Sequence, residues 1–119
     1  MAITMYGIKN CDTVRAARGW MKDREIDYRF VDFRADRLQP AIVQDWFERA
    51  GWRTVLNTAS TGFRALPDAE KAAVDEARAR SLILADPTVV KRPVLDLGDQ
   101  LLFGFKPGAY EVALAAPRR

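Results

Sequence analysis

The stretch ITMYGIKNCDTVRAARGWMKDREIDYRFVDF, residues 3–33, decides the predicted fold of this chain. Residues 3–8 form a short apolar run, which predicts a buried strand. Residues 12–24 carry apolar side chains at helical spacing, and residues 27–33 alternate between two faces as a strand does. A strand, a helix and a second strand within about 30 residues form a βαβ unit. We therefore expect the two strands to be parallel, with a right-handed crossover.

The C-terminal part of the chain predicts an antiparallel pair of strands and a last helix. Residues 93–105 contain two apolar runs around a Gly-Asp pair, which indicates a β-hairpin. Pro107 suits the first turn of a short helix. That helix would carry the apolar residues Tyr110, Val112 and Leu114.

Between these two halves, residues 39–86 predict a mainly helical insertion. Pro40 suits the first turn of one helix. Residues 53–66 have a mixed pattern and predict a loop with room for a short helix. One further helix is expected between Pro67 and Pro87. The order βαβ, helices, ββα belongs to the α/β class and is that of a thioredoxin-like fold with a helical insertion between the halves.

Length and composition suit a single domain over residues 1–119. Hydrophobic residues make up 49% of the chain, enough for a buried core at this size. No run approaches the roughly 20 apolar residues of a membrane-spanning helix, and the N-terminus is too short and mixed for a signal peptide. A single cysteine excludes an internal disulfide and suits the reducing cytoplasm. We expect a cytoplasmic monomer with no membrane partner, since nothing in the pattern demands a dimer.

The charge pattern argues against nucleic-acid binding. The chain has 19 basic and 16 acidic residues and a net charge of +3. The two signs are interleaved, as on solvated faces, and do not form a basic stripe. There is no histidine, which removes histidine-based general-base catalysis and most zinc sites. A metal site would need clustered carboxylates, which the sequence lacks, so we predict no metal and no nucleic-acid partner.

Cys11 lies between the first predicted strand and the first predicted helix. A thiol at this position meets unpaired backbone N–H groups and the positive end of the helix dipole, both of which favour the thiolate. Lys9 precedes it by two residues and Arg15 follows it by one helical turn, so each adds a nearby cation. Asn10 and Asp12 are both candidate N-caps of the helix.

Two interpretations of Cys11 remain open from the residues alone. A lone cysteine is most often a small buried apolar residue, but Cys11 sits between polar residues in KNCDT, which favours a reactive thiol. Val14 stands where a dithiol motif would place its second cysteine. An oxidised Cys11 would therefore be a mixed disulfide with another molecule, a sulfenic acid or an adduct. Other polar residues, such as Arg92 ahead of a strand that begins with proline, read most simply as surface or loop positions.

Three motifs resemble the ArsC/Spx family and, within it, the YffB-type ArsC-like proteins. They are YGIKNCDT, TASTGFRAL and KRPVLDLGDQLLFGFKPGAYEVAL, and the resemblance runs over residues 3–114. It implies a thioredoxin fold with a helical insertion and makes Cys11 the redox nucleophile. It also implies a cis peptide bond before Pro93, which faces the cysteine. Arg92 would point toward Cys11 and offer a bidentate donor to an oxyanion or a carboxylate.

The chain also departs from relatives within that family. Arg15 matches an arginine of the family's arsenate reductases, but Asn57 and Lys106 stand where those enzymes carry further arginines. Gly7 replaces a histidine of those enzymes. Val14 replaces the second cysteine of the Spx switch.

The resemblance therefore implies a glutathione-dependent thiol-disulfide oxidoreductase with glutathione as co-substrate and no tightly bound cofactor. Glutaredoxin or an oxidised protein thiol would be further partners. The alternatives are an arsenate reductase proper and a non-enzymatic, Spx-like regulator that binds RNA polymerase. The residues expected to bind glutathione or substrate are Lys9, Asn10, Arg15, Asn57, Pro93 and Lys106, beside Cys11 and Arg92 as catalytic residues.

Overall fold

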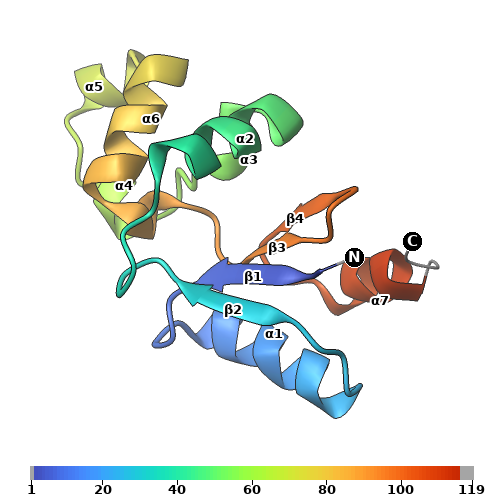
Figure 1. Ribbon diagram of the computed structural model, residues 1–119. Helices are drawn as coiled ribbons and strands as arrows, with labels where there is room; N and C mark the ends of the chain where they lie inside the picture. Colours follow the sequence, from blue (N-terminus) through green and yellow to red (C-terminus); the bar gives the residue numbers. More distant parts are fainter. Residues whose placement is uncertain (1, 116–119) are drawn as a thin grey trace. The chain divides into compact units, whose positions relative to one another are not determined.

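A four-stranded mixed sheet organises the first and last parts of the chain (Figure 1). In this computed structural model, which describes residues 2–115, the strand order is β2-β1-β3-β4. The pair β1 and β2 is parallel, whereas β3 runs antiparallel to both β1 and β4. The predicted parallel βαβ unit and the predicted hairpin are both confirmed. The strands are β1 (Thr4–Gly7), β2 (Arg29–Asp32), β3 (Val94–Asp96) and β4 (Leu101–Phe103).

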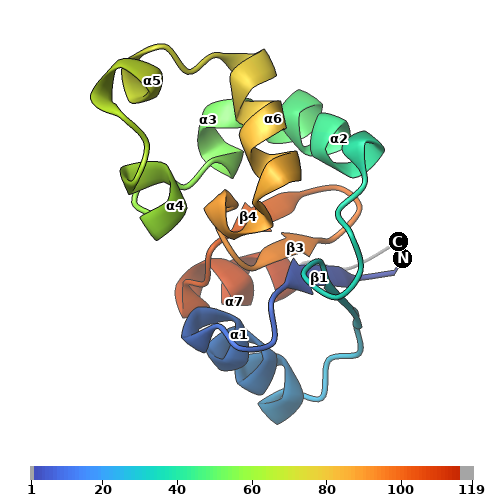
Figure 2. The same cartoon turned by 90° about the vertical axis from the view of Figure 1, so that its left-hand side faces the viewer.

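Two helices cover one face of this sheet, as Figure 2 shows. They are α1 (Asp12–Asp23) and α7 (Pro107–Ala115). Alternate residues of a strand share a face, so β1 and β3 present Met5 and Leu95 together, as a directly opposed pair. The helices close the core over this pair, and its buried members are Met5, Ala17, Met21, Leu95, Leu97, Tyr110 and Ala113.

The predicted last helix is confirmed as α7, and Val112, one of the apolar residues expected on it, is 77% exposed. The buried residues of α7 are Tyr110 and Ala113. Positions three apart lie on one helical face, whereas a position two residues on points away from it. Val112 therefore lies on the exposed side of α7.

The chain divides into two units: the sheet unit, residues 2–36 and 92–115, and a helical unit, residues 37–91. Its first helix begins at Pro40 as predicted, and Gly51, at φ 87°, is the C-cap residue. The stretch predicted as a loop holds two short helices. The helices are α2 (Pro40–Ala50), α3 (Trp52–Val55), α4 (Thr61–Arg64), α5 (Asp68–Ala72) and α6 (Glu76–Ala85), followed by a 3-10 turn, η1 (Pro87–Val89).

The single helix predicted between Pro67 and Pro87 is wrong, because the chain breaks between α5 and α6. Asp75 is the N-cap residue at which α6 begins. Its carboxylate accepts a hydrogen bond from the Arg78 N–H at 2.8 Å. The buried face of α6 consists of Ala79 and Ile83. No helix within residues 2–115 is long and apolar enough to cross a membrane.

Candidate active site around Cys11

Cys11 is the N-cap residue of α1, with an extended backbone at φ −105° and ψ 127°. Its N–H donates to the Ile8 carbonyl at 3.2 Å, and its carbonyl accepts the first helical hydrogen bond from the Arg15 N–H at 2.9 Å. The thiol is free and half-buried. The prediction that Asn10 or Asp12 caps this helix is wrong. Asn10 lies in the turn before α1, and Asp12 is the first residue of α1.

The strand register brings four chain segments to one edge of the sheet. Gly7 and Asp32, the last residues of β1 and β2, pair with each other. One residue earlier on β1, Tyr6 pairs with Val94, the first residue of β3. Val94 in turn pairs with Phe103, the last residue of β4. The turn that leads to Cys11 therefore leaves the sheet where β2 and β4 end and where β3 begins.

Arg92 and Pro93 enter the sheet at this edge. The peptide bond between them is cis, as the family resemblance implied. Pro93 is buried, and its carbonyl accepts a hydrogen bond from the Gly104 N–H at 3.0 Å. Arg92 is half-buried, and its guanidinium donates no hydrogen bond and forms no ion pair among residues 2–115. Its planar donor set thus remains available for a carboxylate or an oxyanion.

Arg15 does not stand as a lone cation beside the thiol. It forms an ion pair with Asp12 one turn earlier, and the side chains of Arg15 and Asp12 are 58% and 93% exposed. Water screens such a pair strongly, and the carboxylate offsets much of the positive charge that Arg15 was expected to supply near Cys11.

The exposed amines of Lys9 and Lys106 have no ion-pair partner among residues 2–115. Lys9 lies in the turn before Cys11, and the carbonyl of Lys106 accepts a hydrogen bond from the Tyr110 N–H at the start of α7. Asn10 is exposed in the same turn as Lys9. All three side chains belong to the sheet unit, as Arg92 does.

Asn57 belongs to the helical unit. Its N–H donates to the Val89 carbonyl at 2.7 Å, and its side-chain oxygen accepts from the Ala59 N–H at 3.0 Å. These bonds make it a local turn residue. The other predicted site residues all belong to the sheet unit.

Asp32 is a residue of this edge that the sequence reasoning missed. Its Oδ1 accepts hydrogen bonds from the N–H groups of Arg34 and Ala35, at 2.9 and 3.2 Å. Its Oδ2 accepts from the Lys9 N–H at 3.3 Å. Partial burial acts to raise the pKa of Asp32, but the three backbone hydrogen bonds and the Lys9 charge outweigh it, so the pKa lies below its usual value. The available signal was an aspartate at the end of a strand predicted to run parallel to the Cys11 strand.

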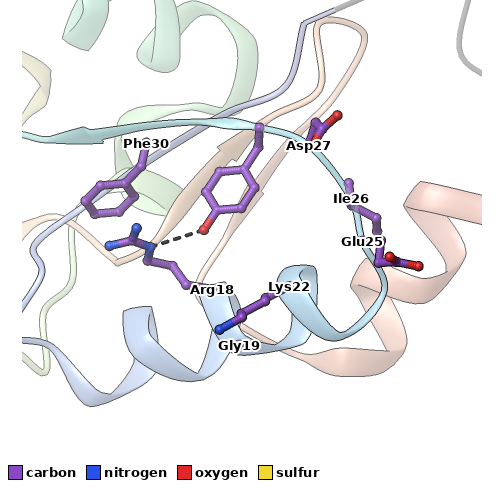
Figure 3. A pocket seen from close by; sticks show the side chains of 8 residues that line it. Arg18, Gly19, Lys22, Glu25, Ile26, Asp27 and Phe30 are labelled. Carbon is purple, nitrogen blue, oxygen red and sulfur yellow. Dashed lines mark hydrogen bonds between the residues drawn. The ribbon is translucent and has the colours of Figure 1, made fainter.

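A groove lies further along α1 (Figure 3) and contains none of the predicted site residues. Its volume is about 560 Å³. Arg18 is fixed there by two contacts: its Nε donates to the Tyr28 hydroxyl at 3.1 Å, and its guanidinium lies 4.1 Å from the Phe30 ring centre. These contacts fasten α1 to β2. The lining residues are Arg18, Gly19, Lys22, Glu25, Ile26, Asp27, Tyr28 and Phe30.

The chemistry available at the sheet edge is that of a single thiol with cations nearby. No group of three His, Cys, Asp or Glu side chains in residues 2–115 is placed to hold a metal ion. The free thiol of Cys11 is the nucleophile present, and Arg92, Lys9 and Lys106 are donors suited to anionic groups.

Comparison with known proteins confirms the family resemblance. A family model described as the ArsC family matches residues 6–113. An uncharacterized protein from Haemophilus influenzae is 36% identical over 113 residues, which cover 95% of this chain and 99% of that protein.

Solved structures confirm the thioredoxin-like α/β fold. A YffB protein is similar at a TM-score of 0.89 with 47% identity, over 95% of this chain and 99% of that one. An arsenate reductase (ArsC) related protein from Brucella melitensis is similar at a TM-score of 0.80 with 44% identity, over 98% of this chain and 97% of that one.

Proposed function

This chain belongs to the ArsC family, and from that premise we propose that it is an oxidoreductase that uses Cys11 as its single nucleophilic thiol and glutathione as its co-substrate. The observation that carries the proposal is a free, half-buried thiol at the start of α1, in a chain with no second cysteine. A thiol without a partner in its own chain needs an external thiol to complete a redox cycle. Glutathione, abundant in a reducing cytoplasm, is that thiol.

The proposed cycle has two thiol–disulfide exchanges. The Cys11 thiolate attacks one sulfur of a substrate disulfide, forms a mixed disulfide with it, and releases the other sulfur as a thiolate. A glutathione thiolate then attacks the substrate sulfur of that mixed disulfide. This step leaves a glutathione–substrate disulfide and returns Cys11 as a thiolate. The electron pair that reduces the substrate thus comes from glutathione, and no bound cofactor is required.

Arg92 is proposed as the residue that holds the anionic partner. Glutathione carries two carboxylates, and a guanidinium binds a carboxylate through two parallel N–H donors. Arg92 stands next to buried Pro93 at the start of β3, so its backbone is held by the sheet. Lys9 and Lys106 would add single charges at the rim. Asn10, Arg15 and Pro93 complete the proposed contacts, with Arg15 weakened by its pair with Asp12.

We expect the protein to act as a monomer, with glutaredoxin or an oxidised protein thiol as further partners. The test is glutathione-dependent reduction of a small disulfide, followed by oxidation of NADPH through glutathione reductase. Cys11→Ser should lose turnover to background, because a hydroxyl cannot form the mixed disulfide. A Cys11→Ser protein that keeps full turnover would remove the mechanism.

A substitution at Arg92 tests its proposed role in binding glutathione. Arg92→Lys keeps the charge but loses the second donor, so the KM for glutathione should rise about tenfold, with a smaller change in kcat. Arg53→Lys, at an exposed arginine of α3 in the helical unit, is the matched control and should leave both constants unchanged. Equal effects of the two substitutions would contradict a specific role for Arg92.

A second candidate function is arsenate reduction, which is favoured by the name of the Brucella melitensis relative. Arg92, Lys9 and Lys106 could hold an oxyanion beside Cys11. This function predicts saturable arsenate reduction that requires glutathione and glutaredoxin, together with protection of Cys11 from alkylation by arsenate or phosphate. Protection by glutathione alone would favour thiol reduction. A Cys11→Ala protein that still functions in the cell would instead favour a binding role such as that of a regulator.

A further inference from the structure

We propose that Asp32 is a positioning residue for the Cys11 thiol, because its carboxylate holds the turn before Cys11 against the end of β2. This inference deepens the proposed function and rests on it for its catalytic consequence. Asp32 touches no reacting atom. It acts through the backbone of Lys9, two residues before the nucleophile.

The two carboxylate oxygens of Asp32 accept hydrogen bonds from different segments of the chain. Oδ1 closes the turn that follows β2, by accepting from the N–H groups of Arg34 and Ala35. Oδ2 reaches a segment that lies 23 residues earlier in the chain and accepts from the Lys9 N–H at 3.3 Å. A turn of this kind needs one acceptor oxygen. The second oxygen is therefore not needed for the local turn and serves the neighbouring segment.

The segment that Oδ2 holds is the tight turn leading to Cys11. This turn leaves the sheet at Gly7, whose carbonyl accepts from the Phe33 N–H at 3.0 Å. It then closes through the bond from the Cys11 N–H to the Ile8 carbonyl at 3.2 Å. The Lys9 N–H lies between these two bonds, and within residues 2–115 its acceptor is the Asp32 carboxylate. The Cys11 backbone is thereby linked to the ends of both parallel strands.

Such a link matters for exchange at sulfur. Attack on a disulfide requires the nucleophilic sulfur to lie in line with the bond that breaks, and small displacements of a nucleophile lower the rate strongly. The carboxylate is ionised at neutral pH, and a hydrogen bond to a charged acceptor is stronger than one to a neutral acceptor. Asp32 therefore restricts the turn more firmly than an amide or a hydroxyl would.

The test separates the two oxygens of Asp32. Asp32→Asn keeps an acceptor for the Arg34 and Ala35 N–H groups but replaces Oδ2 by an NH₂ group, which cannot accept from Lys9. Asp32→Ala removes both acceptors. Asp27→Asn, at an exposed carboxylate ahead of β2, is the matched control for the loss of one charge.

We expect Asp32→Asn to change the rate of Cys11 alkylation by neutral iodoacetamide by about twofold to tenfold, the range of one lost hydrogen bond. The kcat for disulfide reduction should fall by a similar factor, with the KM for glutathione unchanged. The Lys9 amide should exchange faster with water by NMR, while the amides of Arg34 and Ala35 stay protected. Asp27→Asn should behave as the unsubstituted protein in all three measurements.

Two outcomes would overturn the inference. The first is an Asp32→Asn protein with unchanged alkylation, unchanged kcat and unchanged Lys9 exchange. The second is an equal effect of Asp27→Asn. Alkylation and amide exchange need no glutathione, so they test the positioning of Cys11 even if the unsubstituted protein shows no disulfide reduction. If Asp32→Asn changes alkylation and exchange but the unsubstituted protein reduces no disulfide, the proposed function fails and the role of Asp32 in positioning Cys11 stands. If the unsubstituted protein reduces disulfides but Asp32→Asn changes neither alkylation nor exchange, only the role of Asp32 is rejected.

Discussion

Gly7 and Gly19 show how differently one residue type can be constrained within a single βα unit. A Cβ added at Gly7 would lie 2.9 and 3.1 Å from the two methyl groups of Val14, which packs against the strand from α1. A Cβ added at Gly19, within α1, would meet no atom within 4 Å. The close approach at Gly7 also means that any side chain there would require Val14 to move.

We expect the two alanine substitutions to have opposite signs. Gly7→Ala should lower the free energy of unfolding by about 1–3 kcal/mol, because buried Val14 must shift. Gly19→Ala should raise it by about 0.5–1 kcal/mol, because alanine restricts the unfolded chain and favours the helix. Urea unfolding of the two variants measures both effects. Shifts of the same sign would contradict the packing described at Gly7.

Asp32 gives a prediction for pH. A carboxylate whose pKa is lowered in the folded state stabilises the fold above its unfolded value of about 3.9, and this stabilisation disappears as the pH falls through the lower folded value. The difference in unfolding free energy between the unsubstituted protein and Asp32→Ala should therefore be largest at neutral pH and should shrink below about pH 4. Urea unfolding at a series of pH values tests this, and a constant difference would argue against the hydrogen bonds to the ionised form.

At the scale of elements, α7 is held to the sheet unit by Tyr110. The ring is fully buried and meets Trp20 of α1 and Phe105 edge-on, with centroid distances of 5.5 and 4.8 Å. Its hydroxyl has no hydrogen-bond partner within residues 2–115. Burial raises the pKa of Tyr110 far above its usual value, with a smaller contribution from Tyr28. The hydroxyl is thus a buried polar group that the packing does not satisfy.

Two substitutions at Tyr110 separate the ring from its hydroxyl. Tyr110→Phe should leave the stability unchanged or raise it by up to about 1–3 kcal/mol, since it removes an unsatisfied polar group and keeps the ring contacts. Tyr110→Ala should cost about 3–5 kcal/mol, because it leaves a cavity between α1 and α7. Thermal and urea unfolding measure both changes. A clear loss of stability in Tyr110→Phe would show that the hydroxyl has a partner in solution.

The strands and α1 are the elements that could be predicted from the sequence. The strands and α1 follow patterns of period 2 and 3.6 that each segment carries in itself, so the βαβ unit and the hairpin were predictable. The break between α5 and α6 was not predicted, because the residues on both sides of it suit a helix and the stop depends on the Asp75 cap. The exposure of Val112 could not be predicted, because the side of α7 that is buried depends on the side chains that the sheet and α1 pack against it.

At the scale of the whole molecule, the net charge of +3 should attract anionic reagents to the protein. Iodoacetate and iodoacetamide alkylate Cys11 by the same chemistry but differ in charge. The rate with iodoacetate divided by the rate with iodoacetamide should fall as the salt concentration rises from about 10 mM to about 1 M. The reason is that the screening length shrinks from about 30 Å to about 3 Å. Lys106→Glu should lower the ratio at low salt. A ratio independent of salt would mean that the charges do not act at the thiol.

The sequence by itself determined the strand and helix pattern of the two halves, the single thiol and its place at a strand–helix junction. These features are local, because each depends on the order of residues within one segment. Strand pairing decided the rest. The antiparallel pair of β1 and β3 brought Arg92 to the edge where Cys11 caps α1, and the parallel pair of β1 and β2 placed the Asp32 carboxylate against the Lys9 N–H. A contact between residues 23 positions apart leaves no periodic trace in the sequence, because it exists only once the sheet has formed.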